Sequence, residues 1–231
     1  MPQKSGKKLV IAGARQMGEV ALDYFTNDSE YEVVAFTVDR AYLDGAELFG
    51  LPVVPLDEVA RRFPPASHDL FVAVFSSGLN RVREDLCRRT RALGYHLVSY
   101  VSSRADVART ATLGPNCMVF PMVHVMPRAT VGEGVILGPG AVVAHHARIE
   151  PYAFLTIAAS VGGGAVVGAR SFLGIGCIVT DEVKVGPDCL IGAGTCIRSD
   201  VEAGKVLAAP KPTEKPFTAL EYFGGTAARK P

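Results

Sequence analysis

The sequence predicts two domains of different classes: an α/β domain followed by an all-β domain whose strands coil into a parallel β-helix. Residues 1–102 alternate short apolar runs with amphipathic stretches, which is typical of a small Rossmann-like sheet. Residues 103–210 instead repeat with a period of six, which predicts stacked coils. Residues 211–231 follow the last repeat and are expected to form a C-terminal tail.

The elements of the first domain follow from the spacing of its apolar residues. Short apolar runs predict four strands, at Lys8–Ala12, Glu32–Val38, Leu70–Phe75 and His96–Tyr100. Amphipathic spacing predicts three helices between them, at Gln16–Phe25, Asp57–Arg62 and Arg81–Leu93. Because strands and helices alternate, we expect a parallel sheet.

The repeat of the second domain is unbroken. Every sixth residue from Val107 to Ile197 is aliphatic, and the residue four places later is small, from Ala111 to Val201, in all sixteen units. A unit with two such inward residues forms a short strand and a bend, and three units close one triangular coil. An α-helix would need a period near 3.6. Eight residues that follow the aliphatic position are glycines, which we expect to supply the backbone angles of the bends. We expect the core of these coils to be self-contained.

Composition argues against several classes of function. The 231 residues are 48% hydrophobic and 20% charged, with a net charge of +1 and no Trp, so we expect neither a nucleic-acid partner nor a membrane partner. The apolar run at residues 9–12 is too short for a signal or membrane segment, and we expect a cytoplasmic protein. The cysteines lack zinc spacing, so we expect no metal, and Cys117, Cys177 and Cys189 fall on the small buried position.

Two adjacent histidines are the strongest candidates for chemistry. His145 and His146 occupy the third and fourth places of a repeat unit, which face outward at a bend, so the core does not need either ring. A neutral imidazole, with a pKa near about 6.5, is suited to accept a proton from an attacking amine or hydroxyl. A solvated surface pair is the alternative interpretation.

The turn after the first strand is a candidate phosphate site. Gly13 follows the predicted strand and Gly18 lies early in the predicted helix. The turn between them leads into the helix N-terminus, where a phosphate group could approach the backbone. Arg15 stands where a dinucleotide fingerprint has its middle glycine. Tight packing of strand against helix is the alternative role of the two glycines.

The unbroken repeat over residues 107–202 is the signature of left-handed β-helix proteins. With the α/β domain ahead of it, the chain resembles the bacterial hexapeptide-repeat sugar acyltransferases, which include sialic-acid O-acetyltransferases and nucleotide-aminosugar N-acetyltransferases. The resemblance implies a homotrimer that transfers an acyl group, in the first place acetyl, from acetyl-CoA to an amino or hydroxyl group of a nucleotide sugar. The pathway implied is bacterial surface-glycan biosynthesis.

The resemblance also implies roles for individual residues. His145 matches the general base, and His146 stands where many relatives have an acidic residue, so either another carboxylate or His146 itself would orient the base. The residues that would contact acetyl-CoA are Phe154, in place of a second histidine, the backbone of Ile175 and Ala193, and Pro210 and Lys211 of a shortened Gly-x-Pro-Ala-Lys stretch. The residues that would hold the nucleotide sugar are Gly13, Arg15, Gln16, Met17, Val38 and Asp39.

Three other functions remain open at this stage. The same chemistry could act on an amino acid or a free sugar. A metalloenzyme like the γ-class carbonic anhydrases shares the β-helix, but the spacing of His124, His145 and His146 does not match its three ligands. A non-enzymatic binding protein could retain the fold, because the acidic neighbour and the second histidine are both absent.

Overall fold

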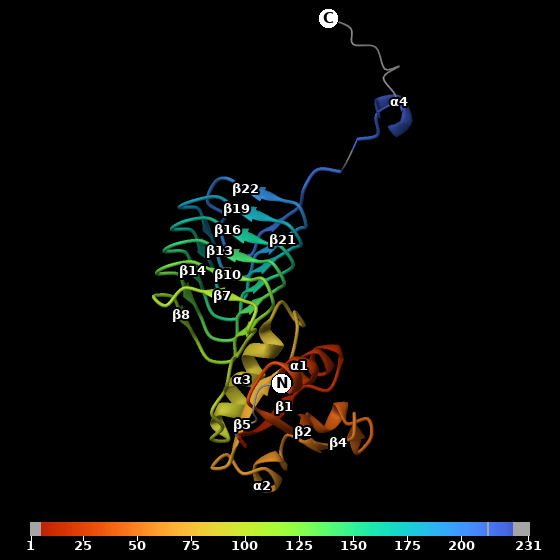
Figure 1. The fold of residues 1–231 in the computed structure, drawn as a ribbon, viewed down its shortest axis with the longest axis vertical. Coiled ribbons are helices and arrows are strands. Elements are labelled where there is room, and N and C mark those ends of the chain that lie inside the picture. The colour runs from red at the N-terminus through yellow and green to blue at the C-terminus, as the bar shows by residue number, and fades with distance from the viewer. Residues whose placement is uncertain (1–5, 212, 224–231) are drawn as a thin grey trace, which may run out of the picture.

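The computed structural model describes residues 6–211 and 213–223, and it places an α/β domain against one end of a three-sided β-helix (Figure 1). This confirms the predicted fold class, including the left-handed parallel β-helix.

The α/β domain is built on a five-stranded sheet with the order β3-β4-β2-β1-β5. Strand β1 is central because all its residues from Leu9 to Ala12 are apolar and fully buried, as a strand covered on both faces requires. The parallel strands are β1 (Lys8–Ala12), β2 (Glu32–Val38), β4 (Leu51–Pro55) and β5 (His68–Val72), and β3 (Glu47–Leu48) is antiparallel to β4. The helices are α1 (Gln16–Asn27), α2 (Val59–Arg62) and α3 (Arg81–Ala92), with a 3-10 turn at Arg40–Tyr42.

Two predicted strands differ from the structure. The run predicted at Leu70–Phe75 is paired only as His68–Val72. The Ala73 N–H still donates to the carbonyl oxygen of Ala12, and Phe75 packs against Phe154 of the β-helix. The strand predicted at His96–Tyr100 is wrong: Leu97 makes one bridge to Leu70, whereas Tyr100 already pairs with Met118 of the β-helix.

The β-helix consists of three parallel sheets, named here after their first strands. Up to the strand at Ile178–Val179, each strand pairs with the strand 18 residues later, as in the pair Val125 and Val143, so three six-residue units make one coil. The last pair, Leu190 with Val206, is 16 residues apart. The β6 sheet contains β6 (Tyr100–Val101), β9 (Met118–Val119), β12 (Ile136–Leu137), β15 (Phe154–Leu155), β18 (Phe172–Leu173), β21 (Leu190–Ile191) and β23 (Val206–Leu207). The β7 sheet contains β7 (Asp106–Val107), β10 (His124–Val125), β13 (Val142–Val143), β16 (Ser160–Val161), β19 (Ile178–Val179) and β22 (Cys196–Ile197). The β8 sheet contains β8 (Thr112–Leu113), β11 (Thr130–Val131), β14 (Arg148–Ile149), β17 (Val166–Val167) and β20 (Lys184–Val185).

The corners of the coils correct the expected role of the glycines. Left-handed φ values occur three places after the aliphatic residue, at every sixth residue from Asn116 to Gly194, and most of these residues are not glycine. The eight glycines directly after the aliphatic residue have no positive φ. A Cβ on Gly168 would lie 2.4 Å from the backbone carbon of Gly186 in the next coil. These glycines therefore permit close stacking of coils and do not form the bends.

The two domains share one core, so the expectation of a self-contained β-helix core is wrong. Buried side chains form a continuous cluster from Leu9 and Phe25 in the α/β domain, through Tyr100 and Met118, to Ile197 near the far end. Phe25 and Tyr100 have ring centroids 5.5 Å apart. The expected buried cysteines Cys117, Cys177 and Cys189 are confirmed as part of this core.

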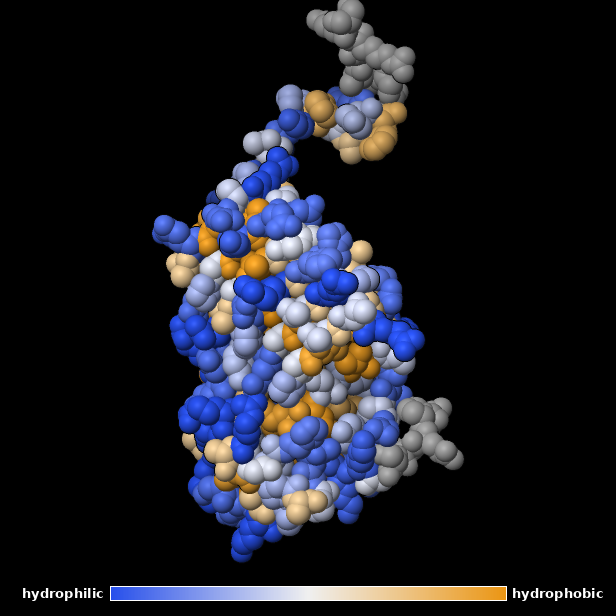
Figure 2. All heavy atoms as spheres, turned by 90° about the vertical axis from the view of Figure 1, so that its left-hand side faces the viewer, coloured by the Kyte–Doolittle hydropathy of each residue, from blue (hydrophilic) through white to orange (hydrophobic). Residues whose placement is uncertain are grey.

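Beyond β23 the chain leaves the body of the protein. Helix α4 (Ala219–Phe223) carries Leu220 and Phe223 with exposures of 84% and 85%. Figures 1 and 2 show this segment rising clear of the coils. Within residues 6–211 and 213–223, no helix has the length and hydrophobicity that crossing a bilayer requires.

Candidate active site

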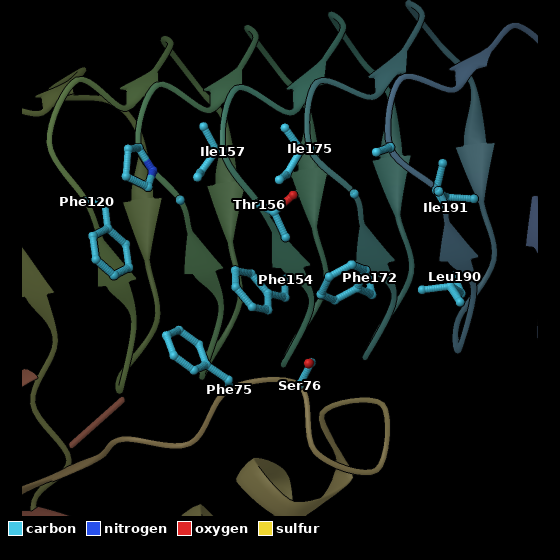
Figure 3. A pocket seen from close by; sticks show the side chains of 15 residues that line it. Phe75, Ser76, Phe120, Phe154, Thr156, Ile157, Phe172, Ile175, Leu190 and Ile191 are labelled. Carbon is cyan, nitrogen blue, oxygen red and sulfur yellow. The ribbon is translucent and has the colours of Figure 1, made fainter. Parts of the chain in front are cut away.

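An apolar groove of about 660 Å³ runs along the corner between the β6 and β7 sheets (Figure 3). The β-helix supplies large side chains from strands β15, β18 and β21, and backbone from successive corners. The α/β domain supplies the loop after β5. The residues that line the groove are Phe75, Ser76, Phe120, Gly138, Pro139, Phe154, Thr156, Ile157, Phe172, Gly174, Ile175, Leu190, Ile191, Gly192 and Ala193.

The structure brings together three of the five residues predicted to contact acetyl-CoA. Phe154, Ile175 and Ala193 all line the groove, and Ile175 and Ala193 lie at equivalent corners of adjacent coils. Pro210 and Lys211 follow β23 and are not among the lining residues. The backbone N–H groups of Ile175 and Ala193 donate no hydrogen bond to any described residue, which suits the carbonyl groups of an extended pantetheine arm.

Aromatic side chains line the side of the groove that faces the α/β domain (Figure 3). Phe75 stacks on Phe154 with ring centroids 5.9 Å apart and an interplanar angle of 5°. Phe172 meets Phe154 edge-on, with centroids 5.3 Å apart. Since Phe154 and Phe172 are paired neighbours in the β6 sheet, the coil spacing fixes this contact.

A second pocket, of about 560 Å³, lies in the α/β domain. All six residues predicted to hold a nucleotide sugar line it: Gly13, Arg15, Gln16, Met17, Val38 and Asp39. The N-terminus of α1 opens into it, and such a terminus favours anions such as phosphate.

The glycines of this turn also have the packing role named as the alternative. Gly13 has φ +120°, and a Cβ there would lie 2.4 Å from the carbonyl oxygen of Ala73. A Cβ on Gly18 would lie 2.2 Å from the carbonyl oxygen of Gly13. Close packing therefore requires both glycines, and the same packing brings the α1 N-terminus to the pocket.

The rim of the second pocket carries charges and an aromatic ring. Arg89 donates hydrogen bonds to both carboxylate oxygens of Asp39, which lowers the pKa of Asp39 despite partial burial. Arg15 lies over the ring of Tyr42, with its guanidinium carbon 5.6 Å from the ring centroid. Asp39 is therefore an ionised acceptor whose oxygens already have one partner.

The two pockets share a wall. Phe75 lines both of them, whereas Ser76 faces the groove and Ser77 faces the second pocket. Figure 3 shows Phe75 and Ser76 beneath Phe154 and Phe172, with the Ser76 oxygen directed into the groove. A ligand in either pocket would therefore approach the other at this turn.

Arg83 fixes this wall from behind. Its side chain is 1% exposed and donates to four backbone carbonyls: those of Val74 and Phe75 in the wall, and of Gly134 and Tyr152 in the β-helix. Burial lowers its pKa to about 10, so it remains a cation at neutral pH. Sequence reasoning missed Arg83. The available signal was its spacing with Leu86, Cys87 and Thr90, which places a charge on the buried face of α3.

The two histidines lie at a different corner, between the β7 and β8 sheets. Both are exposed, as predicted, and their Nδ1 atoms are 3.2 Å apart. In the described part of the chain, no ion pair joins a carboxylate to His145, so His146 is its polar partner. His145 stands over Gly163 of the next coil, where a Cβ would lie 2.6 Å from its Cε1 atom. Within one chain, therefore, the predicted base does not line the groove.

Among residues 6–211 and 213–223, no group of three or more His, Cys, Asp or Glu side chains is placed to hold a metal ion. His124 contacts Asp106 at 3.5 Å. It lies one coil before the pair His145 and His146.

The six-residue repeat and its stacked coils resemble those of hexapeptide-repeat transferases. The family model for the bacterial transferase hexapeptide (six repeats) matches residues 110–145. No curated protein matches the sequence at a significant level.

Solved structures give more particular likenesses. The acetyltransferase domain of PglB from Neisseria gonorrhoeae, in complex with acetyl coenzyme A, is 27% identical with a TM-score of 0.79, over 88% of this chain and 96% of that one. The GDP-perosamine N-acetyl transferase from Caulobacter crescentus, in complex with CoA and GDP-perosamine, is 28% identical with a TM-score of 0.77, over 87% of this chain and 93% of that one. The resemblance to sugar acetyltransferases of the left-handed β-helix type is thus confirmed.

Proposed function

We propose that the protein transfers the acetyl group of acetyl-CoA to an amino group of a nucleotide-activated sugar, in bacterial glycan biosynthesis. The observation that carries this proposal is the shared wall at Phe75. On one side lies an apolar groove with accessible corner amides, and on the other a pocket at a helix N-terminus. The relatives named above were solved with acetyl-CoA, or with CoA and a GDP-sugar.

In this proposal acetyl-CoA lies along the groove, and its thioester lies beside Phe154. The pantetheine arm contacts the backbone at Ile175 and Ala193. The nucleotide occupies the second pocket, with its diphosphate at the N-terminus of α1 and its base or ribose near Asp39. The amine then meets the thioester at the turn Phe75–Ser77.

The reaction needs a base that accepts a proton from the attacking amine. The amine nitrogen bonds to the acyl carbon, the carbon–sulfur bond breaks, and the proton passes through the base to the departing CoA thiolate. We assign this base to His145, whose Nδ1 faces the Nδ1 of His146 at 3.2 Å. Such a base contributes roughly 10²–10⁴-fold to the rate.

We further propose that the protein acts as a homotrimer in the cytoplasm, where both substrates are made. The groove and His145 lie at different corners of the same triangular coil. Three β-helices around a threefold axis would bring the histidine corner of one subunit to the groove corner of the next. The trimer is therefore required to complete the site.

The direct test is release of free thiol from acetyl-CoA with a panel of UDP-, GDP- and dTDP-linked sugars that carry a free amine. We expect turnover with at least one amino sugar and none with its N-acetylated form. Turnover with a hydroxyl-only sugar would make the protein an O-acetyltransferase. Absence of thiol release with every nucleotide sugar, together with release with free sugars or amino acids, would contradict the proposal.

A further inference from the structure

The groove contains very few polar side-chain atoms. Of its fifteen lining residues, only Ser76 and Thr156 carry a hydroxyl, and the others are glycine or apolar. The Thr156 hydroxyl donates to the carbonyl oxygen of Leu173 at 2.8 Å, so its proton is already used. The Ser76 hydroxyl makes no hydrogen bond with any residue that the structure describes.

Ser76 also stands where the chemistry of the proposed function would take place. It follows Phe75, which separates the groove from the second pocket, and it faces the groove beside the ring of Phe154 (Figure 3). Its neighbour Ser77 lines the second pocket instead. The two adjacent serines therefore line different pockets.

The reaction requires a hydrogen-bond donor in the part of the groove beside Phe154 and Ser76. When the amine attacks the acyl carbon, the carbonyl oxygen becomes negatively charged until the carbon–sulfur bond breaks. A phenylalanine ring cannot donate a hydrogen bond to that oxygen, and an unpaired charge in an apolar groove is costly. A fixed donor aimed at the oxygen lowers this cost more than it stabilises the neutral thioester.

Given the acetyl transfer proposed above, we infer that the Ser76 hydroxyl is a catalytic residue that donates a hydrogen bond to the carbonyl oxygen of the acyl thioester. The turn that carries it is held in place for this role. Arg83 donates to the carbonyls of Val74 and Phe75, and the backbone N–H of Asn80 donates to the carbonyl of Ser76 at 3.2 Å. A donor held in this way needs no rearrangement in the transition state.

The kinetic test compares Ser76→Ala with the wild type at saturating acetyl-CoA and nucleotide sugar. Loss of one donor of this kind is expected to lower kcat by roughly 10²–10³-fold and to leave KM for the nucleotide sugar unchanged. Ser67→Ala, which alters an exposed serine of the α/β domain, is the control and should match the wild type. An unchanged kcat, or a raised KM with unchanged kcat, would show that Ser76 does not act on the acyl oxygen.

Rescue gives a second test. In the double variant Ser76→Ala/Phe154→His, a ring N–H beside the same turn replaces the missing donor, so part of the lost kcat should return. Phe154→Leu in the Ser76→Ala background removes the ring without adding a donor and should give no recovery. Equal activity of the two double variants would count against the inference.

A spectroscopic test does not depend on the acceptor. With acetyl-CoA labelled with ¹³C at the carbonyl, the infrared carbonyl band of the bound thioester should lie at lower wavenumber in the wild type than in Ser76→Ala. If the band shifts but no nucleotide sugar is turned over, the proposed function fails and the contact stands. If turnover occurs and the band is the same in both proteins, the inference fails and the proposed function stands.

Discussion

The two corner histidines differ in what their backbone permits. His146 has φ +59°, in the left-handed region that the coil imposes at this corner position, whereas His145 has no such constraint. The two side chains therefore leave the corner in different directions, and their rings meet edge-on with an interplanar angle of 82°. Only one of them can be directed at a given acyl carbon, and His146 is placed to orient the other ring.

Replacing the two histidines separately should give unequal effects. We expect His145→Ala to lower kcat by roughly 10²–10⁴-fold, because the amine then loses its proton acceptor. His146→Asn keeps a residue that tolerates positive φ, and it should cause a smaller loss, seen mainly as a shift of the pH–rate profile. Steady-state rates over a pH series measure both effects. Equal and mild losses would indicate that positioning alone drives the reaction.

Arg83 should be more important for stability than any other arginine at the domain boundary. Arg83→Met removes a buried cation that satisfies four carbonyls, so we expect the free energy of unfolding to fall by roughly 3 kcal/mol or more. Arg81 pairs with Asp188 across the same boundary but is 59% exposed, and Arg81→Met should cost less than about 1 kcal/mol. Urea denaturation of both variants makes the comparison, and similar losses would contradict it.

Single residues were predictable where the repeat or a turn motif fixed their position. The family resemblance implied all six predicted residues of the second pocket and three residues of the groove, at positions that the repeat register or the turn after β1 marks in the sequence. Phe75 and Arg83 were not predicted as site residues, because their importance arises from contacts with coils more than 50 residues away in sequence. A local pattern carries no record of such contacts.

At the scale of elements, the end of α1 is tied to the entry of the β-helix. The carboxylate of Asp28 accepts hydrogen bonds from the Tyr100 hydroxyl at 2.6 Å, the Ser103 N–H at 2.9 Å and the Ser102 hydroxyl at 3.2 Å. Partial burial alone would raise the pKa of Asp28, but these donors outweigh it and the pKa lies below the usual value. The ionised form therefore stabilises the folded protein.

This contact should make stability depend on pH. The pKa of Asp28 is lower in the folded protein than in the unfolded chain, where it is about 4. The stabilisation is therefore fully present above the pKa of the unfolded chain and is lost as pH falls through the pKa of the folded protein. We expect Asp28→Asn to cost about 1 kcal/mol at pH 7, since the site is partly exposed, and almost nothing near pH 2. Urea denaturation at both values tests this. A cost that is equal at both pH values would exclude the carboxylate as its source.

Prediction from sequence succeeded best for elements with a strong period. The period of six predicted the sixteen strands from β7 to β22, although not β6 or β23. Strands β1 and β2 were predicted with their observed bounds. The β3–β4 hairpin was not predicted, since it is short and its second strand contains Pro52 and Pro55, which do not suit a ladder. The failure at His96–Tyr100 has a different cause: that segment is divided between two sheets, which an apolar run cannot reveal.

For the whole molecule, the proposed division of the site between subunits predicts complementation. His145→Ala lacks the base but keeps its groove, whereas Ala193→Trp fills an exposed position of the groove and keeps the base. Each variant alone should have little activity. Co-expressed in equal amounts, they should assemble trimers in which about a quarter of the sites combine an intact histidine with an open groove.

Thiol release by the purified mixed trimers measures this recovery, and sedimentation establishes the assembly. Mixing the two variants after separate purification is the control, since stable homotrimers should not exchange subunits. No recovery in mixed trimers of confirmed composition would show that His145 and the groove of one subunit act together.

The 18-residue coil also restricts how this architecture can change in evolution. A residue inserted within a strand would turn the inward side chains that follow it in that strand outward, and it would shift the stacking glycine out of line with its neighbours. Corners tolerate a change of length better, as in the last coil, where Leu190 pairs with Val206, 16 residues later. Deletions and duplications of one whole coil avoid both problems. Each changes the length of the β-helix along its axis by about 4.8 Å, the spacing between neighbouring strands. The α/β domain contacts the coils as far as Arg170 and Asp188, so changes beyond these coils would leave the shared wall undisturbed. Related genes should therefore differ in length by whole multiples of the coil, mainly near the C-terminal end of the β-helix.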